Sequence, residues 1–216
     1  LPLRAAIAEL ANRRADAEGA AQARREAAER LGVNPDVPTL LVTGGSLGAL
    51  HVNESMTGAA DALPEGAQVV HLTGRGKDEA VRAAVEAAGL SDRWYVIDYL
   101  TTMEDALAVA DLVVCRSGAG TVAEMEALGL PCIYVPLPIG NGEQRLNAAD
   151  HVAAGGAQLI DDKDFTADFV RRNVFPLLGS ARLEDMAAAS QSLGRAGAAR
   201  ALADLALEQV KEAGRE

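Results

Sequence analysis

Two segments of the chain place glycine and hydroxyl residues directly after a short apolar run. One is Thr-Gly-Gly-Ser-Leu-Gly-Ala at residues 43–49, and the other is Cys-Arg-Ser-Gly-Ala-Gly-Thr at residues 115–121. Each precedes an alanine-rich helical pattern, so each predicts a strand, a tight turn and the N-terminus of a helix. Free backbone N–H groups and the positive end of the helix dipole attract phosphate at such a junction. Two junctions in one small domain favour a ligand that carries more than one phosphate.

Side chains beside the two turns offer further groups to a nucleotide. The hydroxyls of Ser46, Ser117 and Thr121 are candidate donors to the same anion. Glu124 follows Thr121 by three residues and therefore shares its helix face. From there its carboxylate would accept the hydroxyls of a ribose. Phosphate donors together with a diol acceptor predict a pocket for a nucleotide or a nucleotide sugar.

A third polar segment, Asn-Gly-Glu-Gln-Arg-Leu-Asn at residues 141–147, follows the fifth apolar run and begins a helix. Gln144 and Asn147 are three residues apart, so both amides face the same side. An amide donates and accepts hydrogen bonds at once, which suits the hydroxyls of a sugar. The alternative is that both are ordinary polar residues at a helix N-terminus.

Other chemistry is excluded or left open by the sequence. The first turn matches neither the dinucleotide fingerprint nor the P-loop, and each turn alone could equally be a tight connection. Arg116 either contacts phosphate or caps the sheet, and His51 either touches the ligand or lies on a helix surface. The acidic run at residues 162–164 is favoured as a solvated loop over a metal site. No metal set or nucleophilic triad, and no evident orienting carboxylate, surrounds the histidines His51, His71 and His151.

The order of the elements predicts the fold. Strand-like runs occupy residues 39–43, 67–73, 94–98, 111–115, 131–136 and 156–160. Helical patterns lie between them at residues 48–63, 77–88, 103–110, 121–128 and 143–154. This alternation predicts an α/β fold, a doubly wound, Rossmann-like parallel sheet of six strands with helices on both faces. Ligands bind such sheets beyond the carboxyl ends of the strands, where both glycine turns lie.

The two ends of the chain are expected to be helical. Residues 1–36 predict leading helices and a linker, and residues 37–194 predict the ligand-binding domain. Residues 195–216 predict a C-terminal helix with a frayed tail. After the last strand, helices are expected at residues 165–178, 181–193 and 196–211.

Composition limits the class of protein. The 216 residues suit one domain with extra terminal helices, and a net charge of −11 argues against nucleic acid or anionic lipid as a partner. No apolar run could span a membrane and no signal peptide opens the chain, so we expect a cytoplasmic protein. Cys115 and Cys132 are expected to be reduced and buried, as in a reducing compartment. The first residue is Leu1 rather than methionine, which suggests a piece of a longer protein.

Taken together, the motifs resemble the carboxyl-terminal half of the MurG family, the UDP-N-acetylglucosamine transferases that complete the lipid-linked precursor of peptidoglycan. The resemblance covers nearly the whole chain. More loosely, residues 98–147 resemble the donor-site signature of the two-domain GT-B glycosyltransferases. The motifs that carry it are Leu3-Arg4, Gly-Gly-Ser-x-Gly-Ala at residues 44–49, Cys-Arg-Ser-Gly-Ala at residues 115–119 with Thr121 and Glu124, and Gln144-x-x-Asn147-Ala148.

The resemblance implies a domain that binds UDP-N-acetylglucosamine. Arg4 and Ser46 would hold the diphosphate, and the backbone of Leu100 would bind the uracil edge. Glu124 would accept the ribose hydroxyls, and Gln144, with Asn147, would orient the sugar. Backbone groups of the second turn would complete the site: Ala119, Gly120, Thr121, Val122 and Ala123. The implied reaction is inverting attack by the muramyl 4-hydroxyl on the anomeric carbon, which converts lipid I to lipid II with no metal or other cofactor.

The resemblance also implies what this chain lacks. In the family, the amino-terminal half carries the general base, the membrane contact and the acceptor site for the lipid-linked muramyl-pentapeptide. The chain alone is therefore expected to bind the donor without transferring it, and the full-length protein to lie on the cytoplasmic face of the cell membrane. Glu143 stands where the family often has glutamine, which leaves that sugar contact open. The alternatives are the donor subunit of a split GT-B transferase, or another UDP-sugar enzyme of this fold, such as an epimerase.

Overall fold

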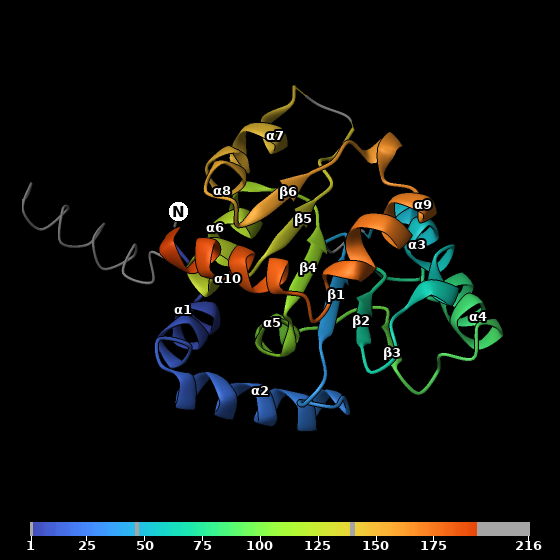
Figure 1. Ribbon diagram of the computed structural model, residues 1–216, viewed down its shortest axis with the longest axis horizontal. Coiled ribbons are helices and arrows are strands. Elements are labelled where there is room, and N and C mark those ends of the chain that lie inside the picture. The colour runs from blue at the N-terminus through green and yellow to red at the C-terminus, as the bar shows by residue number, and fades with distance from the viewer. Residues whose placement is uncertain (1, 46–47, 139–140, 194–216) are drawn as a thin grey trace, which may run out of the picture.

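Parallel strands form the centre of the molecule, as the alternating pattern predicts. The computed structural model describes residues 2–45, 48–138 and 141–193. The six strands within these ranges make one sheet in the order β3-β2-β1-β4-β5-β6 (Figure 1), and every neighbouring pair is parallel. The strands are β1 (Thr39–Thr43), β2 (Gln68–Leu72), β3 (Trp94–Ile97), β4 (Leu112–Cys115), β5 (Cys132–Tyr134) and β6 (Ala157–Leu159). The strand order changes direction between β1 and β4, which makes the carboxyl ends of these two strands the switch point.

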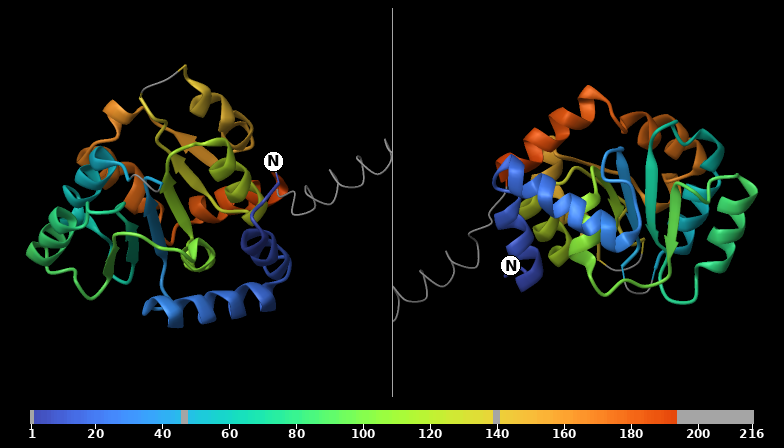
Figure 2. Two further views of the ribbon diagram at one scale, coloured as in Figure 1. Left: turned by 180° about the vertical axis from the view of Figure 1, so that it is seen from behind. Right: turned by 90° about the horizontal axis from the view of Figure 1, so that it is seen from below.

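Helices cover both faces of the sheet, and the view from below in Figure 2 shows them on either side of it. One face is covered by α3 (Leu50–Thr57), α4 (Glu79–Ala87) and the chain from residue 165 into α10 (Ala181–Leu193). The other face is covered by α1 (Ala5–Arg13), α2 (Ala17–Leu31), α5 (Met103–Val109) and α6 (Ala119–Leu128). Because successive strand side chains point to opposite faces, Leu40 and Val42 enter the first core and Leu41 enters the second.

The leading helices pack against the domain. The α2 helix is capped at its N-terminus by Asp16, whose Oδ1 accepts a hydrogen bond from the N–H of Gly19 at 2.8 Å. Its C-cap is Gly32, in the left-handed region. Arg24 of α2 donates to both carboxylate oxygens of Asp111, each at 2.9 Å, and also to the carbonyl of Val37. These contacts attach α2 to the segments that enter β1 and β4.

Three of the expected helices differ in the structure. The pattern over residues 48–63 gives α3, which ends at Thr57, and a separate 3₁₀ turn at Ala60–Ala62. The pattern over residues 143–154 divides at Ala148 into α7 (Glu143–Asn147) and α8 (Ala149–Ala153). The continuous helix predicted over residues 165–178 is wrong, because α9 (Ala167–Phe169) passes into a π-helical turn and then a 3₁₀ turn. Pro176 lies in that last turn, and proline has no N–H with which to continue an α-helix. The helix predicted over residues 181–193 is confirmed as α10, and the one predicted over residues 196–211 lies outside the described residues.

Candidate functional site

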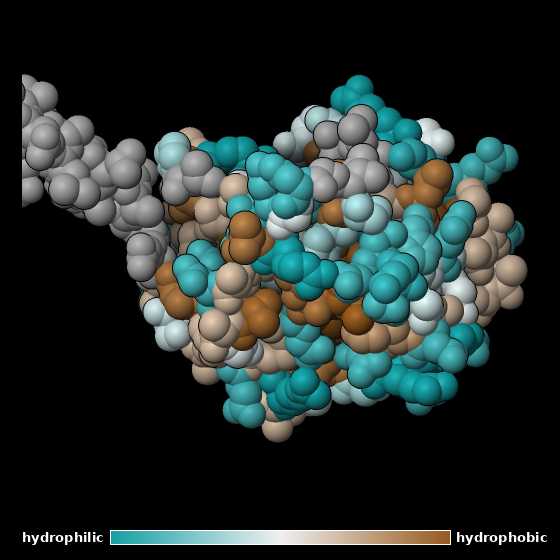
Figure 3. Space-filling model, turned by 90° about the horizontal axis from the view of Figure 1, so that it is seen from above, coloured by the Kyte–Doolittle hydropathy of each residue, from teal (hydrophilic) through white to brown (hydrophobic). Residues whose placement is uncertain are grey.

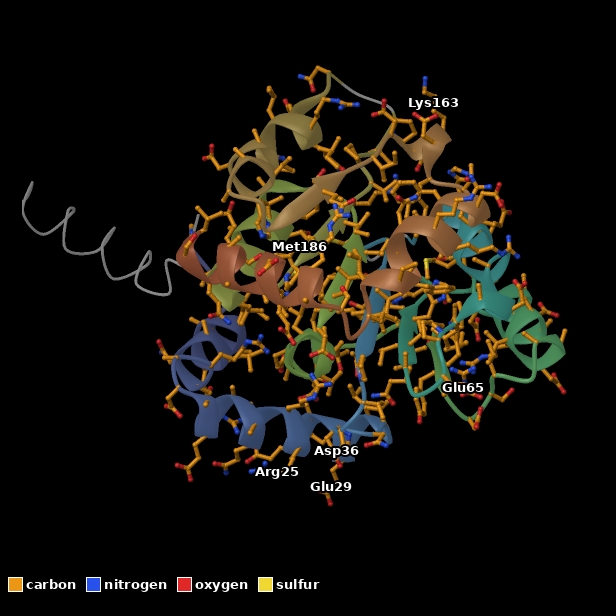
Figure 4. The ribbon with its side chains drawn as sticks, in the orientation of Figure 1. Arg25, Glu29, Asp36, Glu65, Lys163 and Met186 are labelled. Atoms are coloured by element: carbon orange, nitrogen blue, oxygen red, sulfur yellow. The ribbon has the colours of Figure 1, made fainter. Side chains whose placement is uncertain are left out.

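A pocket of about 270 Å³ lies at the carboxyl ends of the strands, beside the switch point. Its walls come from the segments after β1, β2, β3 and β4, together with Arg4 from the segment before α1. Figure 3 views the molecule from above, at the end where the strands stop, and shows apolar side chains between hydrophilic ones. In Figure 4, Lys163 marks this same end, whereas Arg25, Glu29 and Asp36 lie at the opposite end.

The first glycine turn connects β1 to α3 in a backbone arrangement that excludes larger residues. Gly48 has a φ of +67°, and a Cβ there would lie 2.2 Å from the carbonyl oxygen of Thr73. A Cβ on Gly44 would lie 2.3 Å from the backbone nitrogen of Ala49. Gly45 lines the pocket, and its carbonyl accepts a hydrogen bond from Gly48 at 2.9 Å. Ser46, the expected diphosphate ligand, lies outside the described residues.

The second glycine turn leads into α6, whose N-cap residue is Gly118. The amides of Ala119, Gly120 and Thr121 lie in the first turn and have no intrahelical acceptor. No side chain within the described ranges caps this helix in their place. Val122 already donates its N–H to the carbonyl of Gly118 at 3.0 Å. The free amides and the helix dipole therefore make this turn suitable for an anion. Ala123 follows within α6, and its part in the site remains a prediction.

Arg4 and Glu124 bind one another across the pocket. The Nε and Nη2 atoms of Arg4 donate to the two carboxylate oxygens of Glu124 at 2.7 and 2.9 Å. This hydrogen bond raises the pKa of Arg4 above its ordinary value, although partial burial acts in the opposite direction. Both residues line the pocket, as the sequence predicts, but the expected phosphate ligand and the expected ribose ligand form an ion pair.

An aromatic residue, Tyr99, lies at the side of the pocket next to β3. Leu100, the expected contact of the base, lines the pocket beside Tyr99, and the Arg75 guanidinium lies 3.9 Å from the centre of the Tyr99 ring. Neither Arg75 nor Tyr99 was predicted from the sequence. The available signal was a tyrosine directly after the expected strand at residues 94–98, in a chain with few aromatic residues.

A second pocket, of about 480 Å³, lies beside α7. Of the two amides that were expected to act together, Gln144 lines it and Asn147 does not. The Oε1 atom of Gln144 accepts a hydrogen bond from the N–H of Leu137 at 2.9 Å. Asn147 instead donates to the carbonyl of Ser117 at 3.1 Å. Gln144 is thus placed to meet a ligand, whereas Asn147 attaches α7 to the second glycine turn. The hydroxyl of Ser117 is buried and has no hydrogen-bond partner among the described residues.

Arg116, Asp162 and His51 connect the two pockets. The Nη1 atom of Arg116 donates to the carbonyls of Val135 and Pro136, each at 3.0 Å, and to Asp162 Oδ1 at 2.5 Å. The other oxygen of Asp162 lies 2.9 Å from Nδ1 of His51. Arg116 therefore caps the sheet. Of the run expected to be a solvated loop, Lys163 and Asp164 are exposed, but Asp162 is largely buried in these contacts. The expected absence of an orienting carboxylate for His51 was wrong, because helix α3 and the segment after β6 meet here only in the folded chain.

The described residues contain neither a metal site nor a membrane span. Among them, no three His, Cys, Asp or Glu side chains form a set that would hold a metal ion. Within the same ranges, no helix is both long and apolar enough to cross a membrane. Cys115 and Cys132 are buried free thiols, as predicted, and burial raises the pKa of Cys132 well above its ordinary value.

The strand order, the two uncapped turns at the switch point and the acidic residue on α6 define a Rossmann-type α/β domain with a ligand pocket at the carboxyl edge of its sheet. The chain belongs to glycosyltransferase family 28, since the model of that family's C-terminal domain matches residues 39–202.

Individual relatives agree with this membership and with the resemblance that the motifs carry. A UDP-N-acetylglucosamine–N-acetylmuramyl-(pentapeptide) pyrophosphoryl-undecaprenol N-acetylglucosamine transferase of Bifidobacterium adolescentis is 51% identical over 82% of this chain and 48% of its own length. The enzyme of the same name from Paenarthrobacter aurescens is 45% identical over 97% of this chain and 54% of its own. The crystal structure of Acinetobacter baumannii MurG matches with a TM-score of 0.72 at 29% identity, over 84% of this chain and 52% of that one. The chain thus spans about half the length of the curated relatives it matches.

Proposed function

We propose that this chain binds UDP-N-acetylglucosamine as the donor domain of an N-acetylglucosaminyltransferase. The relatives are named for this donor and this transfer. The observation that carries the proposal is one pocket lined by Gly45 of the first glycine turn, by the uncapped first turn of α6 at Thr121, and by Arg4 and Glu124. Such a pocket offers backbone donors to a diphosphate and a carboxylate to a diol.

In the proposed complex, the diphosphate lies between the first glycine turn, with Ser46, and the N-terminus of α6. Binding separates Arg4 from Glu124, so that the guanidinium meets the phosphates and the carboxylate accepts the ribose hydroxyls. The uracil lies against the backbone of Leu100. Gln144 then contacts the sugar from the second pocket, where its Nε2 has no partner among the described residues.

The proposed reaction is inverting transfer of N-acetylglucosamine to the 4-hydroxyl of a lipid-linked muramyl-pentapeptide, the acceptor for which the relatives are named. Negative charge grows on the diphosphate as UDP departs. Fixed backbone donors and helix dipoles that point at this charge stabilise the transition state more than the ground state. This contribution requires no metal in the protein.

The edge of the pocket carries exposed apolar side chains that a further domain of the protein would cover. Within the described residues, four large hydrophobic side chains are exposed: Leu50 at the start of α3, Tyr99 after β3, Leu137 after β5 and Leu146 on α7. All four belong to segments that follow the carboxyl ends of the strands, the end of the sheet where the pocket lies. We propose that the acceptor site, the general base and the membrane contact belong to the part of the protein that faces this edge of the pocket, on the cytoplasmic side of the membrane.

Titration calorimetry with the 216-residue chain tests the donor assignment. We expect binding of UDP and UDP-N-acetylglucosamine in the presence of EDTA, and weaker binding of GDP-mannose. Gln144→Ala should weaken UDP-N-acetylglucosamine binding while leaving UDP binding unchanged, so UDP serves as the internal control. Equal affinity for uridine and guanosine ligands would refute the donor assignment. Binding that disappears in EDTA and returns with magnesium or manganese would refute the metal-free site.

A further inference from the structure

A chain of hydrogen bonds crosses the interior from the edge strand β3 to the rim of the pocket. Trp94 donates its indole N–H to Nδ1 of His71 at 3.3 Å. Nε2 of His71 lies 3.0 Å from Oδ1 of Asn53, and Nδ2 of Asn53 donates to the carbonyl of Thr73 at 3.1 Å. Because Nδ1 accepts from Trp94, Nε2 must carry the imidazole proton and donate to Asn53. Each group in this chain therefore donates to the next, in one direction.

Because these groups are buried, only the arrangement in which each of them is hydrogen-bonded is stable. His71 and Thr73 are fully buried, and Trp94 and Asn53 are 2% and 3% exposed. An unpaired polar group in such surroundings is costly, so each member is held by its neighbours. Burial also lowers the pKa of His71 to about 3, which keeps the imidazole neutral and its tautomer unchanged at ordinary pH.

The chain ends where the first glycine turn touches the sheet. The carbonyl of Thr73, which accepts from Asn53, is the atom that a Cβ on Gly48 would approach to 2.2 Å. Asn53 also belongs to the first turns of α3, since its N–H donates to the carbonyl of the N-cap residue Ala49 at 2.9 Å. Asn53 thus connects the start of α3 to the strand end against which the turn packs.

We propose that Asn53 and His71 are positioning residues that hold Gly48 and the N-terminus of α3 in the geometry that binds the diphosphate. The inference rests on the proposed function, because it concerns the same pocket. Neither residue lines that pocket, so each acts through the turn and not by contact with the ligand. Displacement of a donor by even a fraction of an ångström weakens a charge-assisted hydrogen bond, which makes such support consequential.

A second buried histidine network supplies the matched control. Tyr134 lies 2.9 Å from Nδ1 of His151, and Nε2 of His151 lies 2.8 Å from the hydroxyl of Ser190. These residues join β5, α8 and α10 and do not line the first pocket. Ser190→Ala therefore removes one buried polar group from a histidine network, as Asn53→Ala does, without touching the glycine turn.

The binding test compares UDP with uridine in the whole chain. We expect Asn53→Ala to weaken UDP binding by about tenfold, which corresponds to about 1.4 kcal/mol, and to leave uridine binding unchanged. Ser190→Ala should lower the thermal stability without changing UDP affinity. His71→Leu should behave like Asn53→Ala, whereas His71→Gln, whose amide can both donate and accept, should retain most of the affinity. Wild-type UDP affinity in Asn53→Ala, or an equal loss in Ser190→Ala, would overturn the inference.

Hydrogen exchange separates this inference from the proposed function. In the ligand-free chain, the Gly48 amide bonds to the carbonyl of Gly45. Its exchange should accelerate in Asn53→Ala and His71→Leu but not in Ser190→Ala. Should the wild-type chain fail to bind UDP, the proposed function fails, and the exchange result still decides whether these residues hold the turn. Unchanged Gly48 exchange in both variants would refute the positioning role, and if Asn53→Ala does not fold, the two His71 variants provide the comparison.

Discussion

Removal of the Glu124 carboxylate should weaken UDP binding by about 5- to 60-fold. A hydrogen bond to a charged group contributes about 1.5–3 kcal/mol. In the free protein, however, Glu124 is paired with Arg4, whose side chain is 56% exposed, and an exposed ion pair contributes about 0.5 kcal/mol that binding must give up. The net loss in Glu124→Ala is therefore about 1–2.5 kcal/mol, at about 1.4 kcal/mol for each factor of ten.

Calorimetry with UDP and 2′,3′-dideoxy-UDP isolates the ribose contact. Glu124→Ala should lose affinity for UDP and almost none for the dideoxy ligand, because the second ligand has no hydroxyl to donate. Glu29→Ala is the matched control, since Glu29 is an exposed carboxylate at the opposite end of the molecule (Figure 4). An equal loss for both ligands, or full UDP affinity in folded Glu124→Ala, would show that the carboxylate does not bind the ribose.

Three further outcomes follow from the structure. Gly48→Ala should cost more than about 1 kcal/mol of stability, as measured by urea unfolding, and should weaken UDP binding, because a Cβ there strains the backbone and meets Thr73. Burial lowers the pKa of His71 to about 3 and that of His151 to about 4. The free energy of unfolding should therefore fall as the pH drops below about 6.5, by up to about 1.4 kcal/mol per pH unit for each histidine. The 216-residue chain should show no sugar transfer to a lipid-linked acceptor in a radiolabel assay, since transfer needs the acceptor and a base positioned together.

Each of these outcomes has a control. Gly66 has a similar φ, +74°, but a Cβ there would meet nothing within 4 Å, so Gly66→Ala should lose some stability and keep its UDP affinity. For the pH effect, the two histidines stay neutral when folded but take up protons below about pH 6.5 when unfolded, so stability is highest above that value. His151→Gln should flatten the dependence between about pH 6.5 and 5, and an unchanged slope would contradict the assignment. Robust turnover by the chain alone would contradict the need for a separate acceptor site.

The local sequence pattern was sufficient to predict the parallel sheet and the positions of the two glycine turns. The apolar runs at residues 39–43 and 111–115 became β1 and β4, both buried on each face, as a parallel sheet between helical layers requires. The glycines after β1 were informative because their spacing reflects real steric limits, shown by the contacts a Cβ would make at Gly44 and Gly48. Such constraints act over a few residues and are therefore visible in the sequence.

Contacts between segments that are distant in the sequence could not be predicted from it. Arg4 and Glu124 are 120 residues apart, and Arg116 finds its acceptors on the ends of two other strands. Helical spacing placed Gln144 and Asn147 on one face but could not show that Ser117 would occupy the space before Asn147. Spacing predicts the direction of a side chain, whereas its partner depends on tertiary packing. The irregular segment after residue 165 was different, because Pro176 was a usable signal for a break.

The hydrogen-bond chain that begins at Trp94 also gives the protein an intrinsic fluorophore in a defined environment. Trp94 is the single tryptophan of the sequence, is 2% exposed, and lies edge-on to Phe175 with ring centres 6.4 Å apart. Its emission therefore arises from one site that is dry, aromatic and bonded to an imidazole. A red shift of that emission reports water entering between β3 and the segment around Phe175, at the edge of the sheet farthest from β6. Unfolding of this edge can thus be followed optically in the unlabelled chain, separately from events at the other edge.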